Sequence, residues 1–251
     1  MSFARHQGVT AVVTGAARGI GAATAQRLAS EGAGVVLTDL SAQVEETAER
    51  VRASGGRATA VRADVTDEED WRRVLAAARE NFGPVGILVS NAYTVDIAPA
   101  HETPLDSWER QLGVNLTGAF LGVRACLDDL EATGGSIVVA SSVHAWFGLP
   151  GRPAYATTKG GLTALTRQLA VEYGPRVRVN CVLPGPILTS AWDSVGEQDR
   201  RDSVEQTAAK RFGDPDEVAF VISFLASDEA AYVTGVSLPV DGGWSIYKAS
   251  S

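Results

Sequence analysis

Tyr155 and Lys159 stand four residues apart in the segment Tyr-Ala-Thr-Thr-Lys, a spacing that places two side chains on one face of a helix. A phenol has an unperturbed pKa near ~10, so it is a poor proton acceptor at neutral pH. A fixed positive charge nearby lowers that pKa, and the pair could then act in general acid–base catalysis. Ser142 follows the apolar run 136–140 and could reach the same point from the end of a strand. The spacing alone is common by chance, and a half-buried tyrosine beside a solvated lysine is its more frequent explanation.

A second pattern is the glycine-rich stretch Thr14-Gly-Ala-Ala-Arg-Gly-Ile-Gly21. It lies between an expected strand and an expected helix, which is the setting that a dinucleotide site requires. Gly15 permits a tight turn, Gly19 lets the backbone approach a pyrophosphate, and Gly21 allows close packing of helix and strand. The helix would present free N–H groups to the phosphates. The stretch therefore predicts a dinucleotide-binding turn.

Acidic residues after the next two strands bear on the choice of cofactor. Asp39 would accept hydrogen bonds from the adenosine ribose and repel an added 2′-phosphate, which favours NAD over NADP. Arg18 has the opposite tendency, because a cation in the glycine turn could hold that phosphate. We expect Asp39 to prevail, although a strand-end turn or a helix cap would also explain it. Asp64 either caps the turn that follows it or bonds the adenine amino group.

Short apolar runs and helical patterns alternate along the chain and must position these residues. Strands are predicted at 9–14, 35–38, 58–62, 87–90, 136–140, 177–183 and 236–240. Helices are predicted at 20–31, 41–54 with Ser41 as the capping residue, 67–82, 105–130 with interruptions at Gly113, Asn115 and Gly118, 153–173 and 215–226. This order predicts one doubly wound, Rossmann-type α/β domain over residues 1–251, with a seven-stranded parallel sheet and helices on both faces. The polar stretch at about 186–211 is too long for an ordinary connection, so we expect a substrate lid with a little helix of its own.

Composition excludes several other classes of protein. The chain has 251 residues, 45% hydrophobic and 21% charged, and a net charge of -8, which disfavours nucleic acid and anionic membrane as partners. It contains no apolar run long enough for a membrane span and starts without a signal-peptide pattern. Cys126 and Cys181 are too few for a disulfide scaffold or a zinc site. We expect a cytoplasmic protein without a metal site.

Taken together, these motifs make the chain resemble the short-chain dehydrogenase/reductase family over nearly its whole length. The matching residues are Thr14-Gly15-x-x-x-Gly19-Ile20-Gly21, Asp64-Val65, Asn91-Ala92, Asn115, Ser142, Tyr155-x-x-x-Lys159, Asn180-x-x-x-Pro184-Gly185, Thr189 and Asp241-Gly242-Gly243. Their order and spacing are specific as a set. The thirteen-residue step from Ser142 to Tyr155 resembles the family's own, and this resemblance implies Ser142 instead of Ser141 as the catalytic serine.

The resemblance implies an NAD-dependent oxidoreductase that interconverts a small polar secondary alcohol and its ketone. Tyr155 would be the general acid and base, and Lys159 would hold the nicotinamide ribose and lower the pKa of the tyrosine. Ser142 would hydrogen-bond the substrate oxygen. Asn115 would bend its helix and hold a water that leads to Lys159, although a satisfied buried amide is the alternative. The implied cofactor-binding residues are Gly15, Arg18, Gly19, Ile20, Gly21, Asp39, Asp64, Val65, Asn91, Tyr155, Lys159, Pro184, Gly185, Ile187 and Thr189.

One residue departs from the family pattern. The family usually has Asn-Ala-Gly where this chain has Asn91-Ala92-Tyr93, and the tyrosine ring would narrow the substrate pocket or bond a polar substrate. The candidate substrate-binding residues are Tyr93, Ser142, His144, Trp146, Arg152 and Trp192. They would suit a sugar, a polyol or a hydroxy acid, although packing of the loop or a subunit contact explains them equally well. His144 is not needed as a base, and no second metal ligand stands at a plausible spacing from it in the sequence.

Two other functions and an assembly state complete the expectations. An NADPH-dependent ketoacyl-type carbonyl reductase is disfavoured by Asp39. A non-catalytic nucleotide-binding sensor on the same fold is disfavoured by the complete set Asn115, Ser142, Tyr155 and Lys159. The resemblance also implies a homotetramer, assembled through segments 105–130, 153–173 and 215–240.

Overall fold

Seven parallel strands form a single sheet in the part of the chain that the computed structural model describes, residues 4–248. The ends of the predicted domain, 1–3 and 249–251, lie outside the described residues. The strands are β1 (Thr10–Thr14), β2 (Gly34–Asp39), β3 (Arg57–Arg62), β4 (Val85–Ser90), β5 (Ser136–Ala140), β6 (Arg178–Pro184) and β7 (Ser237–Val240). Their order is β3-β2-β1-β4-β5-β6-β7, which confirms the predicted doubly wound sheet and places its reversal point between β1 and β4.

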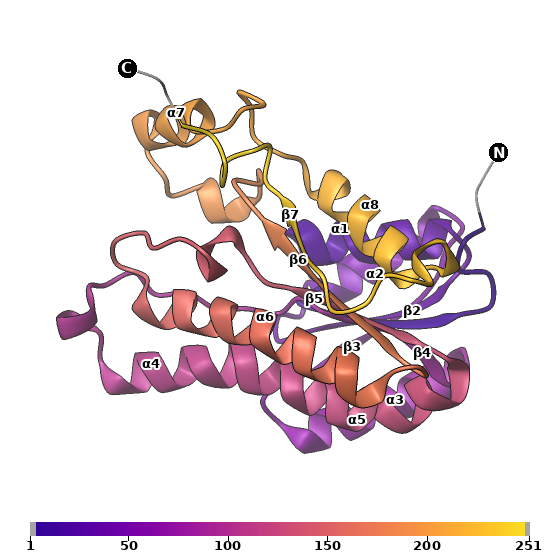
Figure 1. Cartoon of the computed structure of the whole chain (residues 1–251). Coiled ribbons are helices and arrows are strands. Elements are labelled where there is room, and N and C mark those ends of the chain that lie inside the picture. The colour runs from indigo at the N-terminus through magenta and orange to yellow at the C-terminus, as the bar shows by residue number, and fades with distance from the viewer. Residues whose placement is uncertain (1–3, 249–251) are drawn as a thin grey trace.

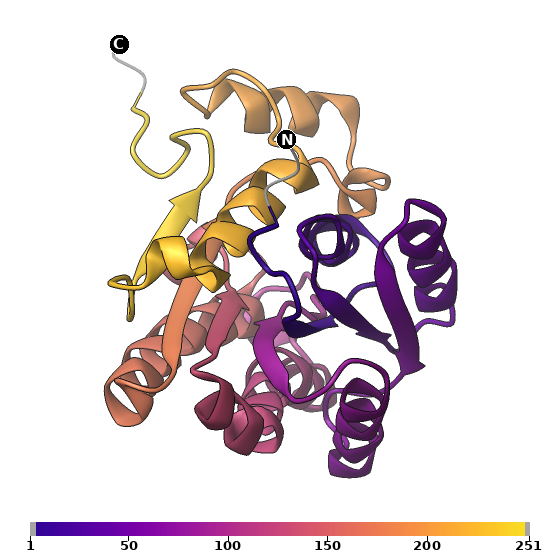
Figure 2. The same cartoon turned by 90° about the vertical axis from the view of Figure 1, so that its right-hand side faces the viewer.

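Helices cover both faces of this sheet (Figures 1 and 2). One layer holds α1 (Gly19–Ser30), α2 (Val44–Ala53) and α8 (Pro215–Ala226), and the other holds α3 (Glu68–Asn81), α5 (Gly118–Thr133) and α6 (Pro153–Tyr173). Successive strand residues point to opposite faces, so Ala11 and Val13 pack in the first layer and Val12 in the second. Continuously apolar strands follow from burial on both sides.

The start of α2 corrects the prediction that a helix over 41–54 begins at a capping serine. The helix begins at Val44, with Gln43 as its N-cap residue. The N–H of Ser41 donates to the Asp39 carboxylate at 2.9 Å, and the Ser41 hydroxyl accepts from the Gln43 N–H at 3.3 Å. Ser41 therefore stabilises a turn ahead of the helix rather than the first helical turn.

The long helix predicted over 105–130 is present in three parts. It consists of α4 (Leu105–Leu112), a π-helical segment at Gly113–Thr117, and α5, which continues to Thr133. A Cβ on Gly118 would lie 2.7 Å from a methyl carbon of Val65, so glycine allows α5 to approach the end of β3 closely. π-helical segments are frequent at functional sites, and this one contains Asn115.

The predicted lid segment does contain short helices, a 3-10 turn at Ser190–Trp192 and α7 (Glu197–Glu205). Its two ends meet, because the N–H of Leu188 donates to the oxygen of Gly213 at 2.9 Å and the N–H of Gly213 donates to the oxygen of Pro186 at 3.0 Å. Figure 1 shows α7 standing apart from the two helix layers. The function of this segment as a substrate lid stays a prediction.

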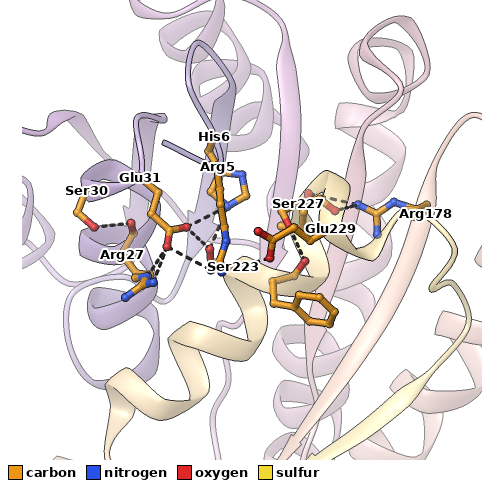
Figure 3. Close-up of polar contacts among 11 residues, drawn as sticks. Arg5, His6, Arg27, Ser30, Glu31, Arg178, Ser223, Ser227 and Glu229 are labelled. Atoms are coloured by element: carbon orange, nitrogen blue, oxygen red, sulfur yellow. Dashed lines mark hydrogen bonds and ion pairs between the residues drawn. The ribbon is translucent and has the colours of Figure 1, made fainter. Parts of the chain in front are cut away.

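A buried polar cluster joins α1 to α8 and to the segment before β1 (Figure 3). Its centre is Glu31, which is 4% exposed. The carboxylate accepts hydrogen bonds from the Ser223 hydroxyl, from Arg27 Nε at 2.6 Å and from Arg5 Nη1 at 3.4 Å. His6 Nε2 lies 3.0 Å from the Ser223 hydroxyl and 3.5 Å from Glu31 Oε2. We call Arg5, His6, Arg27, Glu31 and Ser223 the Glu31 cluster.

Candidate active site

The loops that follow β1, β4, β5 and β6 lie at one edge of the sheet because the strands are all parallel. The glycine turn follows β1, Asn91 follows β4, Ser142 follows β5 and Gly185 follows β6. Two of these loops are hydrogen-bonded to each other, since the Asn91 carboxamide donates to the oxygens of Thr14 at 2.9 Å and Gly15 at 3.1 Å. The fold thus brings most of the predicted site residues to one edge.

Tyr155 and Lys159 lie in the first turns of α6, which starts at Pro153, and Ser142 approaches them from β5. Lys159 is 2% exposed, and its ammonium donates to the oxygen of Ala140 at 2.8 Å. Its Nζ lies 5.4 Å from the centroid of the Tyr155 ring. Ser142 is buried and hydrogen-bonds the Tyr155 side chain. These three predicted residues therefore occupy one site.

Burial controls the protonation of this pair. It raises the pKa of Tyr155, with a further rise from Tyr93, while the hydrogen bond with Ser142 and the charge of Arg152 lower it. Burial also lowers the pKa of Lys159 to about 8. The sequence predicts that Lys159 lowers the pKa of the tyrosine, but in this structure desolvation of the phenol outweighs any such effect.

Asn115 fastens the loop after β4 to α6. Its Oδ1 accepts from the Thr94 N–H at 2.7 Å, and its Nδ2 donates to the Thr94 oxygen at 2.9 Å and to the Thr158 hydroxyl at 3.2 Å. Thr158 in turn donates to the oxygen of Tyr155 at 2.8 Å. The hydrogen bonds of Asn115 agree with the alternative hypothesis of a satisfied buried amide. The water that Asn115 would hold on the way to Lys159 stays a prediction.

The glycine turn has the backbone that a pyrophosphate cradle needs. Gly15 and Gly19 have φ angles of +62° and +57°, a region that favours glycine. A Cβ on Gly21 would lie 2.2 Å from the oxygen of Gly15, so the first turn of α1 packs directly on the glycine turn. Ile20, between them, is half-buried and packs into the core beneath. The N-terminus of α1 and this open backbone fit the phosphates of a dinucleotide.

Asp39 at the end of β2 and Asp64 just after β3 differ in their partners. Asp39 accepts a hydrogen bond from the Ala17 N–H at 3.0 Å, which holds its carboxylate beside the turn. Asp64 accepts from the N–H and hydroxyl of Thr66 at 2.9 and 2.8 Å, so it caps the turn that follows β3. Val65 is buried beneath α5. Arg18 is exposed, and its charge lowers the pKa of Tyr93 against the larger opposing effect of burial.

The segment after β6 reaches the glycine turn. Pro184 ends the strand, the N–H of Gly185 donates to the oxygen of Val240 at 3.1 Å, and Ile187 is buried. A Cβ on Gly19 would lie 3.3 Å from the Thr189 methyl carbon. Thr189 therefore brings the first turn of the lid segment against the expected phosphate site.

Only some of the predicted substrate-binding residues gather at Tyr155. The rings of Tyr93 and His144 stand edge-on to it, with centroids 6.1 and 5.3 Å away. Burial lowers the pKa of His144 to about 4, helped by the charges of Arg152 and Lys159, so this imidazole is neutral at physiological pH. In contrast, the ring of Trp192 in the lid segment packs on that of Phe212 just after the segment, with centroids 4.7 Å apart, and Trp146 is 49% exposed.

Sequence reasoning missed three residues at the edge of the site. Thr94 and Thr158 are the partners of Asn115, but threonine beside a functional residue is too common to carry a signal. Trp244 follows Asp241-Gly242-Gly243 and stacks edge-on with Phe147 at 5.8 Å. The contact between Phe147 and Trp244 joins the loop after β5 to the chain beyond β7. Local sequence patterns cannot predict a contact between residues so far apart in the chain.

Within residues 4–248, no cluster of three or more His, Cys, Asp or Glu side chains has the arrangement to hold a metal ion. None of the helices there combines the length and the apolar character needed to cross a bilayer. Cys126 and Cys181 are buried and unpaired, and burial raises the pKa of their thiols to about 12 and about 11.

Known proteins share this sequence and fold. A family model described as enoyl-(acyl carrier protein) reductase matches residues 15–245. The chain is 39% identical over 249 residues to glucose 1-dehydrogenase 2 of Bacillus subtilis, with 96% of each chain covered. It is 38% identical over 245 residues to 2,5-dichloro-2,5-cyclohexadiene-1,4-diol dehydrogenase LinX of Sphingobium indicum, covering 96% of this chain and 98% of that protein. A solved double mutant of a Serratia marcescens short-chain dehydrogenase/reductase superposes with a TM-score of 0.91 at 36% identity, covering 96% of this chain and 99% of that one.

Proposed function

The chain belongs to the short-chain dehydrogenase/reductase family, and on that premise we propose that it interconverts a small polar secondary alcohol and its ketone, with NAD as the preferred cofactor. The observation that carries the proposal is the convergence of Ser142, Tyr155 and Lys159 at the sheet edge that also holds the glycine turn. Relatives named for the oxidation of glucose and of a cyclic diol support dehydrogenase activity on a secondary alcohol.

Tyr155 is the general acid and base of the proposed reaction. During oxidation its phenolate oxygen accepts the proton of the substrate hydroxyl, and Ser142 holds the substrate oxygen in place. When bound, NAD supplies the hydride acceptor and, in its oxidised form, a positive charge beside the phenol. The ammonium of Lys159, like the charge of oxidised NAD, favours the phenolate and so lowers the pKa of Tyr155, whereas burial raises it. Asn115 keeps the loop after β4 and the start of α6 together.

The preference for NAD depends on Asp39. Its carboxylate is held by the Ala17 N–H at 3.0 Å and the Ser41 N–H at 2.9 Å, and each oxygen keeps a lone pair for a ribose hydroxyl. A 2′-phosphate at that point would meet a negative charge with a fixed position. Arg18 is exposed, and the hydrogen bonds of Asp39 go to the N–H groups of Ala17 and Ser41. The Arg18 guanidinium is therefore the group that would bind the 2′-phosphate if the enzyme accepted NADP.

A sugar, a polyol or a hydroxy acid is the proposed substrate class. The neutral imidazole of His144, the Tyr93 phenol and the Arg152 guanidinium stand near Tyr155, and together they offer hydrogen-bond donors beside aromatic surface. We also propose a homotetramer. Apolar side chains are exposed on the helices that the family resemblance implicates, and they include Phe120 on α5 and Phe220 on α8, which are 46% and 50% exposed.

A panel of sugars, polyols and hydroxy acids incubated with NAD tests the activity through the absorbance of the reduced nicotinamide. We expect turnover with at least one alcohol and a loss of at least about 100-fold in Tyr155→Phe. Tyr173→Phe, at the far end of the same helix, is the control and should retain activity. NAD binding without turnover of any alcohol or ketone would favour the sensor function instead. A monomer by light scattering would contradict the tetramer.

A further inference from the structure

Tyr93 lies between two residues whose main chain is fixed by hydrogen bonds. On one side, the N–H of Ala92 donates to the Thr14 hydroxyl at 3.0 Å. On the other side, Asn115 holds both the N–H of Thr94 at 2.7 Å and its oxygen at 2.9 Å. The backbone at Tyr93 is thus anchored to β1 and to the π-helical segment.

The ring of Tyr93 faces the ammonium of Lys159. Lys159 Nζ lies 5.5 Å from the centroid of the Tyr93 ring and 5.4 Å from that of Tyr155, so the cation lies beside both aromatic rings. The two rings meet edge-on, with an angle of 64° between their planes. An ammonium within about 6 Å of a ring centroid is attracted by the negative face of the ring, and more strongly where water is excluded.

The environment of Lys159 otherwise disfavours a charge. The residue is 2% exposed, and removal from water favours the neutral amine. The hydrogen bond to the oxygen of Ala140 at 2.8 Å offsets only part of that loss for a group with three N–H donors. The titratable groups that face this ammonium are Tyr155 on α6, Tyr93 after β4, His144 after β5 and Cys181 on β6.

We infer that Tyr93 is a positioning residue for the proposed dehydrogenase reaction, and that its ring keeps the Lys159 ammonium charged and fixed beside Tyr155. None of the four facing groups carries a negative charge at neutral pH in this setting, because the tyrosines and the thiol have pKa values above their ordinary range and the imidazole is neutral. The faces of the Tyr93 and Tyr155 rings are therefore the main attractions for the cation besides the oxygen of Ala140. The catalytic meaning of this contact rests on the proposed function, whereas the contact itself rests on the geometry.

Direct titration of Lys159 tests the contact without any assay of activity. The chain has only three lysines, Lys159, Lys210 and Lys248, so lysine labelled with carbon-13 at Cε gives a simple spectrum of the full chain, and Lys159→Met assigns the signal. We expect Tyr93→Leu, which keeps bulk but lacks a ring, to lower the pKa of Lys159 by about half a unit. Tyr93→Phe keeps the ring and should leave that pKa at the wild-type value. Both variants lose the Tyr93 hydroxyl, so their difference isolates the ring.

Lys210 is the internal control, because its ammonium lies 4.2 Å from the centroid of a different aromatic ring, that of Tyr247, and donates to the oxygen of Glu205. Its signal should not move in either variant. Equal pKa values for Lys159 in the Leu variant, the Phe variant and the wild type would overturn the inference. If Tyr93→Leu does not fold by circular dichroism, Tyr93→Met provides the same comparison.

The pH profile of kcat/KM for alcohol oxidation tests the catalytic part. In Tyr93→Leu, kcat/KM should begin to change on the alkaline side at a pH about half a unit lower than in the wild type, because Lys159 loses its proton at a lower pH. In Tyr93→Phe, the alkaline side of the profile should coincide with that of the wild type. An unchanged alkaline side together with a shifted lysine signal would overturn the positioning role. Absence of turnover in the wild type would refute the proposed function while leaving the lysine titration interpretable.

Discussion

Lys159 Nζ and the main-chain oxygen of Ala140 lie 2.8 Å apart, so the last residue of β5 holds the one ammonium at the centre of the candidate site. Ser141, the next residue, donates its hydroxyl to the oxygen of Lys159 at 2.7 Å. The strand and the helix are thus joined at both ends of the lysine. This pairing fixes where the positive charge stands relative to Tyr155 and Ser142, and it predicts what replacement of the lysine will do.

Replacing Lys159 by methionine removes the charge and keeps most of the side-chain volume. We expect kcat/KM for alcohol oxidation to fall by at least about 100-fold, since acid–base catalysis by the phenol loses its cationic partner. Unfolding in urea should show little loss of stability, because the charged form of the lysine is itself disfavoured by burial. A variant that keeps wild-type kcat/KM would show that the ammonium takes no part in the chemistry.

Asn115→Ala should weaken both stability and activity. It leaves the N–H and oxygen of Thr94 without their partner, and an unsatisfied buried polar group costs about 1–3 kcal/mol. The free energy of unfolding from urea titration measures the stability loss. Thr158→Val removes the contact of Asn115 at 3.2 Å together with the hydrogen bond from the Thr158 hydroxyl to the oxygen of Tyr155, but it leaves both contacts with Thr94 in place and is the comparison. Equal stability of Asn115→Ala and the wild type would contradict the anchoring role.

Asp39→Ser should shift the cofactor preference toward NADP. The substitution removes the negative charge at the ribose site and keeps a small acceptor for the Ala17 N–H. We expect the ratio of the Kd values for NADP and NAD to fall by about tenfold or more, the effect of about 1.4 kcal/mol of relieved repulsion. Asp64→Ser, which removes the cap of a neighbouring turn, serves as the control. An unchanged ratio would assign the preference to residues other than Asp39.

The Glu31 cluster predicts a loss of stability in mild acid. Burial lowers the pKa of His6 below its ordinary value of 6.5, while Glu31 raises it and Arg5 lowers it. A depressed folded-state pKa means that the unfolded chain binds more protons below pH 6.5. The free energy of unfolding should therefore decrease as the pH falls below that value. His144, with a pKa of about 4, contributes in the same direction.

Chemical denaturation at a series of pH values checks this prediction. His6→Gln should flatten part of the decline, because glutamine offers a hydrogen-bond donor to the cluster but does not titrate. His101→Gln should leave the curve unchanged, since His101 is exposed and its Nε2 lies 3.3 Å from the carboxylate of its exposed neighbour Glu102. A curve for His6→Gln that parallels the wild type would show that His6 does not couple protons to folding.

The sequence could predict the parts of this protein that depend on local pattern. Apolar runs and the glycine turn predict the strands of the sheet and their alternation with helices. Pro153 and Pro215 correctly predict where two of these helices begin. The predicted start of α2 at Ser41 is wrong because Asp39 and Ser41 form a local turn at the end of β2, and this short-range side-chain contact takes the place of a helix cap at Ser41. The protonation of Tyr155 could not be predicted either, since it depends on how much water the folded loops exclude. The placement of Tyr93 over Lys159 required the path of the loop after β4, which no periodicity encodes.

The contact between α1 and α8 also bears on how the chain reaches its folded state. Glu31 and the apolar side of α1 are covered by α8, and residues 19–30 and 215–226 lie near opposite ends of the sequence. During synthesis the first βα unit must wait until almost the entire polypeptide has left the ribosome before its carboxylate and its apolar stripe are sheltered. Nascent chains that stall before residue 215 should accordingly depend on chaperones.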